Sequence, residues 1–202
     1  MSIELIKELR EKTGAGISAI QEALEESNGD VEKAIIYLRQ KGVTKGEKRA
    51  GKQANEGIIS TYVHHNNRLV VVVEVNTETD FAANSEDLQK FAKDLAVHIA
   101  AMNPRAISLE DLDSSLVEKE KAVFEKELEG KPEEVKQKIV EGKMQKFYEE
   151  NVLLKQSLFS DDSKTVEDYL NEMVAKIGEK IVIRYFYRFE LGKPVVFSEA
   201  KE

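Results

Sequence analysis

Residues 69–84 read LVVVVEVNTETDFAAN, an apolar run that leads into a polar turn with an acid beside an aromatic. The unbroken apolar run Leu69–Val73 predicts a central strand that is covered on both faces. A second β-rich run, Ile58–Val63, precedes it, and His64-His65-Asn66-Asn67 lies between the two. Because Asn tolerates the positive φ of a tight turn, residues 57–76 are predicted to form a β-hairpin.

Helical and strand patterns continue after this turn. Apolar residues at helical spacing predict helices at about 85–102, 115–129, 133–149 and 165–177. The two middle helices are charge-rich and are predicted to pack as an antiparallel pair. Alternation along residues 181–191 predicts a last strand that joins the hairpin sheet. Residues 57–202 are therefore predicted to form an α+β core with a small antiparallel sheet.

The first 44 residues are predicted to form a separate module of three helices. Apolar residues recur at three- and four-residue spacing in three segments, Ile3–Leu9, Ile20–Leu24 and Val31–Leu38. Ser18 followed by Gln21 predicts a capping box for the second helix, and Asp30 is predicted to cap the third. Gly42 is predicted to end the third helix.

Residues 45–56, between the module and the core, are polar and contain Lys45, Lys48, Arg49 and Lys52. We interpret them as a solvated linker or a frayed helix, and the alternative is a site for RNA or an acidic partner. The net charge of −8 favours the linker, because affinity for phosphate comes from clustered Lys and Arg. No direct contact with nucleic acid is expected, and a folded protein is the expected partner.

Several classes of protein are disfavoured by composition and motifs. The chain has no cysteine, which excludes disulfides and thiolate sites and fits a reducing cytoplasm. No apolar run approaches the roughly 20 residues that cross a bilayer. The glycines at Gly14 and Gly16 lack the Lys-Ser/Thr of a phosphate loop. Adjacent His64 and His65 would point to opposite faces of a strand, and His98 is expected to have an ordinary surface or packing role, so no metal, cofactor or enzyme activity is expected.

Asp80 and Phe81 are the candidate functional residues, with two interpretations. In the first, Asp80 caps the turn and Phe81 folds back onto the hairpin. In the second, Phe81 projects toward a partner, and the small Ala82 and Ala83 let the turn approach that surface. A strand and a long helix are expected to anchor the turn on its two sides. Rigid presentation of an aromatic is what an interface hot spot requires, so the second interpretation is favoured.

Motifs that cover nearly the whole chain resemble bacterial elongation factor Ts. They are LREKTGAG at 9–16 with residues 22–24, 28–30 and 38–39; NTETDFAAN at 76–84; and residues 131–132, IVEGKM at 139–144 and residues 164–166. The resemblance implies that residues 1–44 are a ubiquitin-associated-like module that docks on the nucleotide-binding domain of elongation factor Tu. It also implies that Asp80 and Phe81 form a wedge, which enters a cleft near the Mg²⁺ and phosphate site of that partner.

The function implied by this resemblance is guanine-nucleotide exchange on elongation factor Tu in the cytoplasm, without a cofactor. The chain would bind the GDP-bound and nucleotide-free forms of Tu and promote GDP release by disturbing its Mg²⁺ and phosphate site. The wedge residues would be Thr79, Asp80, Phe81 and Ala82, with Phe81 inserted and Asp80 acting on Mg²⁺ coordination. The alternative is a non-catalytic adaptor whose three-helix module binds a protein partner.

The resemblance places the docking contacts at Arg10, Ile17 and Ser18. Ala82 stands where the family usually has Val, and Ser18 replaces a common bulky apolar residue, which implies a thinner docking contact at Ser18. The chain is similar to short members of the family, in which a duplicated core subdomain and a C-terminal helical module are reduced or missing. A homodimer stays open as a second form of association.

Overall fold

A computed structural model describes residues 3–13, 15–49, 51–130 and 132–201. The side chains of Glu11 and of residues 42–48 fall outside this description. Gly14 and Lys131, which belong to the motifs quoted above, also lie outside it.

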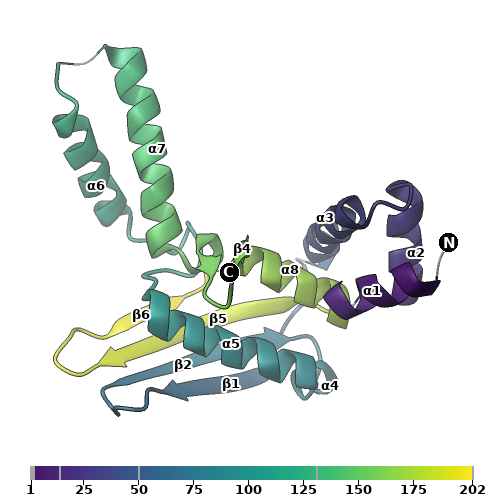
Figure 1. Ribbon diagram of the computed structural model, residues 1–202. Coiled ribbons are helices and arrows are strands. Elements are labelled where there is room, and N and C mark those ends of the chain that lie inside the picture. Colours follow the sequence, from purple (N-terminus) through teal and green to yellow (C-terminus); the bar gives the residue numbers. More distant parts are fainter. Residues whose placement is uncertain (1–2, 14, 50, 131, 202) are drawn as a thin grey trace. The chain divides into compact units, whose positions relative to one another are not determined.

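The α+β class is confirmed (Figure 1). The helices are α1 (Ile3–Thr13), α2 (Ile17–Glu26), α3 (Val31–Arg49), α4 (Asp80–Ala83), α5 (Glu86–Met102), α6 (Ser114–Glu127), α7 (Glu133–Asn151), the short 3₁₀ helix η1 (Leu153–Lys155) and α8 (Val166–Ile177). The strands are β1 (Glu56–Val63), β2 (Leu69–Thr77), β3 (Ser157–Leu158), β4 (Asp161–Thr165), β5 (Ile181–Glu190) and β6 (Val196–Glu199). The larger sheet has the order β1-β2-β5-β6, and β3 pairs with β4 in a small sheet of two strands.

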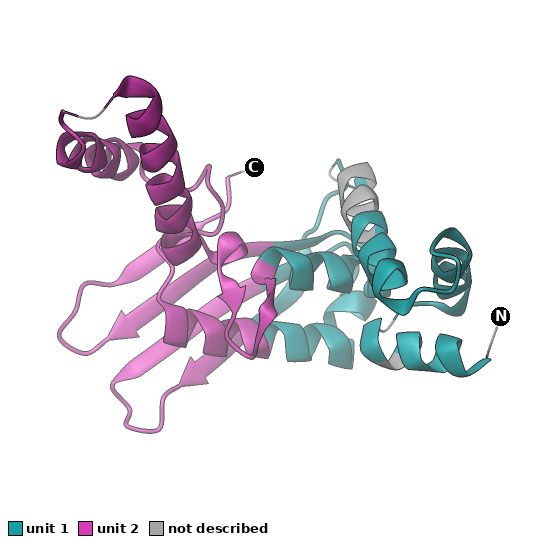
Figure 2. Cartoon of the chain, turned by 45° about the horizontal axis from the view of Figure 1, so that its top comes forward, with its two compact units in different colours: residues 1–59, 75–92, 167–182 teal, residues 60–74, 93–166, 183–202 magenta. Residues whose placement is uncertain are grey.

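The chain divides into two compact units (Figure 2). Unit 1 contains residues 1–59, 75–92 and 167–182, and unit 2 contains residues 60–74, 93–166 and 183–202. The division expected from the sequence, into residues 1–44, 45–56 and 57–202, stays a prediction. Among the described residues, no helix combines the length and the apolar character that a membrane crossing requires.

The three N-terminal helices pack around a small apolar core in unit 1. Its buried residues are Leu9, Ala15, Ile20, Ala23, Leu24, Ala34 and Leu38. Asn28 and Gly29 take positive φ values of 52° and 81° where α2 ends. Asp30 then accepts a 3.1 Å hydrogen bond from the Lys33 N–H, which confirms it as the cap of α3.

Two sequence predictions fail in this module. The helix α2 begins at Ile17 with Gly16 at the N-cap, so Ser18 lies inside the first turn and the predicted capping box is wrong. The helix α3 does not stop at Gly42 but continues to Arg49. A glycine within strong helix formers such as Lys41 costs about 1 kcal/mol without ending the helix. The segment interpreted as a solvated linker or a frayed helix therefore begins as helix.

The strand β2 is buried mainly through alternate residues. Val71, Val73 and Val75 have no exposed surface, whereas Val70 and Val72 are half-buried. The prediction that both faces are fully covered is therefore wrong. β-branched residues fit a half-exposed strand face as well as a buried one, so an apolar run does not separate the two cases.

The strands β1 and β2 approach closely at Gly57 in unit 1. Gly57 has φ of +154°, and a Cβ built there would lie 2.3 Å from the carbonyl oxygen of Val75. The Asn76 side-chain amide donates a 3.1 Å hydrogen bond to the carbonyl of Glu56 beside it. The β1–β2 contact therefore requires glycine at this position.

The helices α6 and α7 form a pair in unit 2, as predicted (Figure 1). Leu128, Val140 and Met144 are buried between them. Lys143 pairs with Glu127 across the contact. Four short segments were not predicted as regular structure: the helical turn η1 and the strands β3, β4 and β6.

His98 is a packing residue in unit 2, as expected, but it is buried rather than at the surface. It is 1% exposed, and its Nε2 lies 2.9 Å from Oε1 of Gln156. Its Nδ1 accepts a 3.1 Å hydrogen bond from the backbone N–H of Phe159. This arrangement holds the neutral ring with its proton on Nε2, and burial lowers the pKa of His98 below its ordinary value.

We expect the folded chain to lose stability as the pH falls below about 6.5, the ordinary pKa of histidine. Below that pH the unfolded chain binds a proton at His98, whereas the folded chain resists it, because its pKa is lowered. The loss has a limiting slope of about 1.4 kcal/mol per pH unit and ends below the folded pKa. Urea unfolding between pH 7.5 and 5.5 measures it.

The matched variants are His98→Gln and His65→Gln, since His65 is exposed. His98→Gln should lower the stability at neutral pH and remove most of the pH dependence, whereas His65→Gln should keep it. An equal pH dependence in all three proteins would contradict this role of His98.

Candidate functional site

The turn predicted at residues 79–84 contains the single-turn helix α4, and Glu78 and Thr79 connect it to the end of β2. Thr79 is its N-cap, and the Thr79 Oγ1 accepts a 3.3 Å hydrogen bond from the Ala82 N–H. The Asn84 side-chain amide donates to the carbonyl of Asp80 at 2.8 Å, and the Ser85 hydroxyl donates to the carbonyl of Ala82 at 2.7 Å. Ser85 also accepts from the Leu88 N–H at 3.3 Å, which joins the turn to the start of α5. The helical turn is thus held at both ends.

The side chains of α4 separate into exposed and buried sets. Phe81 is 86% exposed and Asp80 is also exposed, whereas Ala82 and Ala83 are each 3% exposed. Phe81 therefore does not fold back onto the hairpin. The expected contact residue Ala82 turns into the protein instead. A methyl group in the interior packs α4 against the protein, so Ala82 has no surface to offer a partner.

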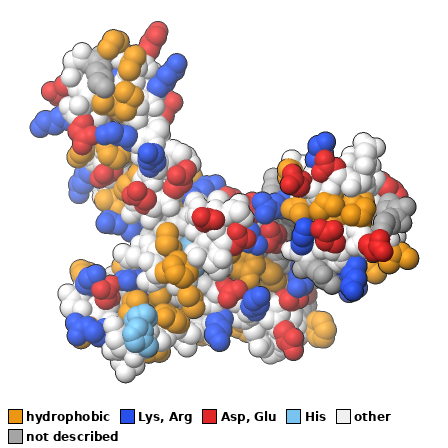
Figure 3. All heavy atoms as spheres, viewed as in Figure 1, with side chains coloured by type: hydrophobic (Ala, Val, Ile, Leu, Met, Phe, Trp, Pro, Cys, Tyr) orange, Lys and Arg blue, Asp and Glu red, His pale blue; other side chains and the backbone are white. Residues whose placement is uncertain are grey.

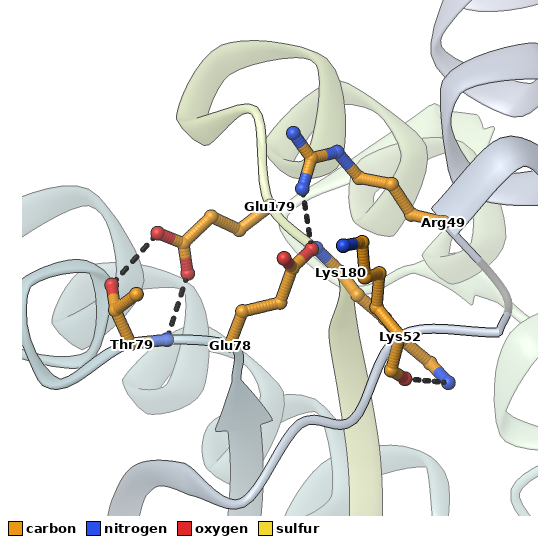
Figure 4. A network of polar contacts seen from close by, with 6 residues as sticks. All are labelled: Arg49, Lys52, Glu78, Thr79, Glu179 and Lys180. Atoms are coloured by element: carbon orange, nitrogen blue, oxygen red, sulfur yellow. Dashed lines mark hydrogen bonds and ion pairs between the residues drawn. The ribbon is translucent and has the colours of Figure 1, made fainter.

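Two glutamates hold the chain just before α4 (Figure 4). Glu179 accepts the backbone N–H of Thr79 at 3.0 Å and the Thr79 hydroxyl at 2.7 Å. Glu78 accepts the backbone N–H of Lys180 at 2.7 Å. Each glutamate thus binds the backbone of the residue that follows the other glutamate. We call these two pairs, Glu78-Thr79 and Glu179-Lys180, the reciprocal clamp.

Basic residues complete the reciprocal clamp within unit 1 (Figure 4). Arg49, the last residue of α3, donates to Glu78 at 2.6 Å, and the Lys180 ammonium donates to the carbonyl of Lys52 at 2.9 Å. The backbone N–H of Lys180, followed by the Arg49 guanidinium, lowers the pKa of the Glu78 carboxyl. The carboxylate therefore stays ionised and available to both donors at neutral pH.

Arg49 belongs to the basic segment for which an RNA-binding site is the alternative interpretation. Its ion pair with Glu78 gives it a structural role in this protein. The side chains of Lys45 and Lys48 lie outside the described residues. On the face in Figure 3, acidic and basic side chains are interspersed over the region of α6 and α7. The ion pair favours a structural interpretation of Arg49.

The expected docking residues lie at the surface of the three-helix module. Arg10 and Ser18 are exposed, and Ile17 is 50% exposed. Arg10 is in the last turn of α1, and the other two open α2, so a short connection separates them along the chain. An exposed isoleucine next to a hydroxyl in the sequence is suited to contact with a folded protein.

The site has the chemistry of a binding surface. Across the described residues, no group of three or more His, Cys, Asp or Glu side chains is placed to hold a metal ion. His64 and His65 do not point apart as expected for a strand: their ring centroids are 4.2 Å apart, because both residues lie beyond the end of β1. What α4 can offer is an aromatic ring and a carboxylate on a fixed turn.

Sequence reasoning found the exposed pair but missed the reciprocal clamp. Glu179 lies 100 residues from Thr79, and its position is set by the end of α8. The available signal was Gly178, which has φ of +81° and ends that helix. A glycine at this position predicts where the helix ends, but it does not predict that Glu179 binds Thr79.

Comparison with known proteins identifies relatives over almost the entire chain. A family model described as "Elongation factor TS" matches residues 4–193. A protein named elongation factor Ts from Syntrophobacter fumaroxidans is 51% identical over 190 residues, covering 93% of this chain and 95% of its own. Its namesake from Caldanaerobacter subterraneus is 51% identical over 197 residues, covering 96% and 98%. One from Thermosipho melanesiensis is 47% identical over 195 residues, covering 96% and 100%.

Proposed function

The chain belongs to the elongation factor Ts family, and from this premise we propose that it is a guanine-nucleotide exchange factor for elongation factor Tu. Its family places it in translation elongation. The observation that carries the exchange proposal is Phe81, which is 86% exposed beside Asp80 on a turn held at both ends. A large aromatic side chain held in solvent is suited to insertion into a partner.

In the proposed complex, Arg10, Ile17 and Ser18 dock the module on the nucleotide-binding domain of Tu. Phe81 enters a cleft near the Mg²⁺ and phosphate site, and the carboxylate of Asp80 disturbs the Mg²⁺ coordination. This chain binds the GDP-bound and nucleotide-free forms of Tu. It needs no cofactor and changes no covalent bond, so it is not an enzyme in the chemical sense.

The thermodynamics of exchange follow from linkage. If this chain binds nucleotide-free Tu more tightly than GDP-bound Tu, it must weaken GDP binding by the same factor. Each tenfold loss of GDP affinity requires about 1.4 kcal/mol of differential binding. Burial of one Phe side chain supplies about 1.5–3 kcal/mol, or one to two factors of ten. The rest must come from the docking contacts and from Asp80.

The test is the rate of fluorescent GDP release from purified Tu in the presence of excess unlabelled nucleotide. The proposed function requires the rate to rise with the concentration of this chain until it saturates, with the chain itself unchanged. The adaptor alternative allows binding to Tu but no change in the GDP off-rate. A folded chain that leaves the off-rate unchanged at saturation would contradict the proposed function.

Asp80→Asn should lower the saturated rate of GDP release about tenfold at millimolar Mg²⁺, or ~1.4 kcal/mol, because the variant lacks the charge that competes for Mg²⁺. The defect should shrink when Mg²⁺ is chelated, since removal of the metal does what Asp80 is proposed to do. The off-rate is measured at both Mg²⁺ levels. The exposed Asp162 of β4 supplies the control Asp162→Asn. If the Asp80→Asn defect persists without Mg²⁺, Asp80 acts in another way.

A homodimer is the second association left open by the sequence. It is supported by aromatic rings on β5 and β6: Phe197 stacks on Tyr187 at 4.6 Å between centroids, and Tyr187 lies 6.1 Å from Phe189. All three are between 39% and 45% exposed. Exposed apolar patches of this kind are typical of association sites. A monomer mass of 22.8 kDa by sedimentation equilibrium at all concentrations would contradict the homodimer.

A further inference from the structure

We infer that Glu179 is a positioning residue for nucleotide exchange: through Thr79 it fixes the orientation in which α4 presents Asp80 and Phe81. The inference rests on the proposed exchange function and deepens it. Its basis is the pair of hydrogen bonds from Thr79 to Glu179, at 3.0 Å from the backbone N–H and 2.7 Å from the hydroxyl.

The first step of the argument is that α4 cannot hold its own direction. It has only four residues, from Asp80 to Ala83. A single helical turn is unstable alone, because the cost of ordering the first turn is recovered only by further turns. The direction of Phe81 therefore depends on the packing of Ala82 and Ala83 beneath α4 and on the residues that anchor its ends.

The second step is that the anchor at the N-terminal end is Thr79. Its hydroxyl oxygen accepts the Ala82 N–H at 3.3 Å while its hydroxyl proton is donated to Glu179 at 2.7 Å. One side chain thus connects α4 to Glu179. The two oxygens of Glu179 bind separate donors of Thr79, which fixes the rotation of the residue as well as its position.

The third step is that Glu179 itself is well placed. The N–H of Gly178 bonds the carbonyl of Val174 at 2.9 Å, and the φ of +81° at Gly178 ends α8 just before Glu179. After Glu179, the N–H of Lys180 is bound by Glu78 at 2.7 Å. The backbone is therefore held by hydrogen bonds on both sides of Glu179. Glu179 in turn holds Thr79, the N-cap of α4.

The variants Glu179→Ala and Glu179→Gln separate positioning from general support of the fold. Glu179→Ala removes both acceptors, so the saturated rate of GDP release from Tu should fall about tenfold, as expected when a remote change misplaces a reacting group. The concentration for half-maximal exchange should change less than about threefold. This split is expected because Arg10, Ile17 and Ser18 are untouched. In Glu179→Gln the amide oxygen can accept the Thr79 N–H while its NH₂ donates to the Thr79 hydroxyl, so most of the rate should return.

A second pair of variants tests the same contact from the other side. Thr79→Val removes the hydroxyl with little change of shape and should slow exchange, whereas Thr79→Ser should restore it. The double variant Glu179→Ala/Thr79→Val should be no slower than the worse single variant, because both act through one contact. If the double variant instead lost rate by the product of the two single-variant factors, the inference would be overturned. The exposed Glu86 of α5 supplies the control Glu86→Ala.

The outcomes separate this inference from the function on which it rests. If the unmodified chain fails to accelerate GDP release, both are wrong. If it accelerates release and Glu179→Ala does so equally well at saturation, only the positioning role is wrong. A lower melting temperature of Glu179→Ala with a normal saturated rate also overturns it, because Glu179 would then only support the fold.

Discussion

Phe81→Ala should weaken the complex with elongation factor Tu by about 2 kcal/mol, which is roughly a thirtyfold rise in Kd. Phe81 is 86% exposed, so its ring has almost its full apolar surface left to bury in a partner. For the same reason its removal should barely change the stability of the chain itself. A buried Phe cut back to Ala would instead cost about 3–5 kcal/mol of folding stability. Titration calorimetry with nucleotide-free Tu and thermal melting of the free variant measure the two quantities.

The matched control is Phe159→Ala, which removes another exposed aromatic side chain, 61% exposed, from unit 2. It should leave the affinity for Tu within about twofold, since scattered surface residues contribute little to an interface. If the two variants lost equal affinity for Tu, Phe81 would not be an interface hot spot. Normal affinity of Phe81→Ala together with a much lower melting temperature would assign Phe81 to the fold.

Gly57→Ala should destabilise the protein by about 3 kcal/mol or more, the largest effect we expect on the fold. The added methyl group would lie 2.3 Å from the carbonyl oxygen of Val75 and 2.8 Å from the Cα of Asn76. Both atoms belong to the backbone of β2, so neither can rotate away as a side chain would. Overpacking of this kind costs about 1–3 kcal/mol, and the φ of +154° adds backbone strain of similar size. Urea unfolding gives the difference directly.

Gly142→Ala is the control for this prediction, because Gly142 lies inside α7 with nothing within 4 Å of an added Cβ. There the same substitution should stabilise the protein by about 0.5–1 kcal/mol, since Ala is the better helix former. Two glycine substitutions should thus have opposite signs in one protein. A Gly57→Ala variant as stable as the parent would mean that β1 and β2 can separate there without cost.

Local patterns predicted most of the regular structure. The alternation in β5 and the apolar stripe of α5, with Leu88, Phe91 and Leu95 fully buried, are periodic enough to identify an element without its neighbours. The exposed Phe81 was also favoured, since a strand and a helix were expected on either side of it. The motifs that resembled elongation factor Ts named the family that the comparisons then identified.

Features that depend on distant residues were not predictable in this way. The strands β3 and β6, with two and four residues, are too short for a period, and they exist because they pair with β4 and β5. The burial of Ala82 depends on what lies beneath α4, which the sequence around it does not specify. The helix α3 was predicted to end at Gly42, but it continues to Arg49. The cost of one glycine is smaller than the stabilisation from the helix-forming residues around it.

The reciprocal clamp also sets an order of events during synthesis. Thr79 and Glu179 are 100 residues apart, and a ribosome adds about 5–20 residues per second, so Glu179 is made roughly 5–20 s after its partner. Until then Thr79 can cap α4 but lacks the two hydrogen bonds to Glu179 that fix its own position. An unfinished chain that already carries residues 1–44 therefore lacks the contact that fixes the orientation of Phe81. Under the proposed function, an unfinished chain that lacks Glu179 would exchange nucleotide about tenfold more slowly than the finished protein.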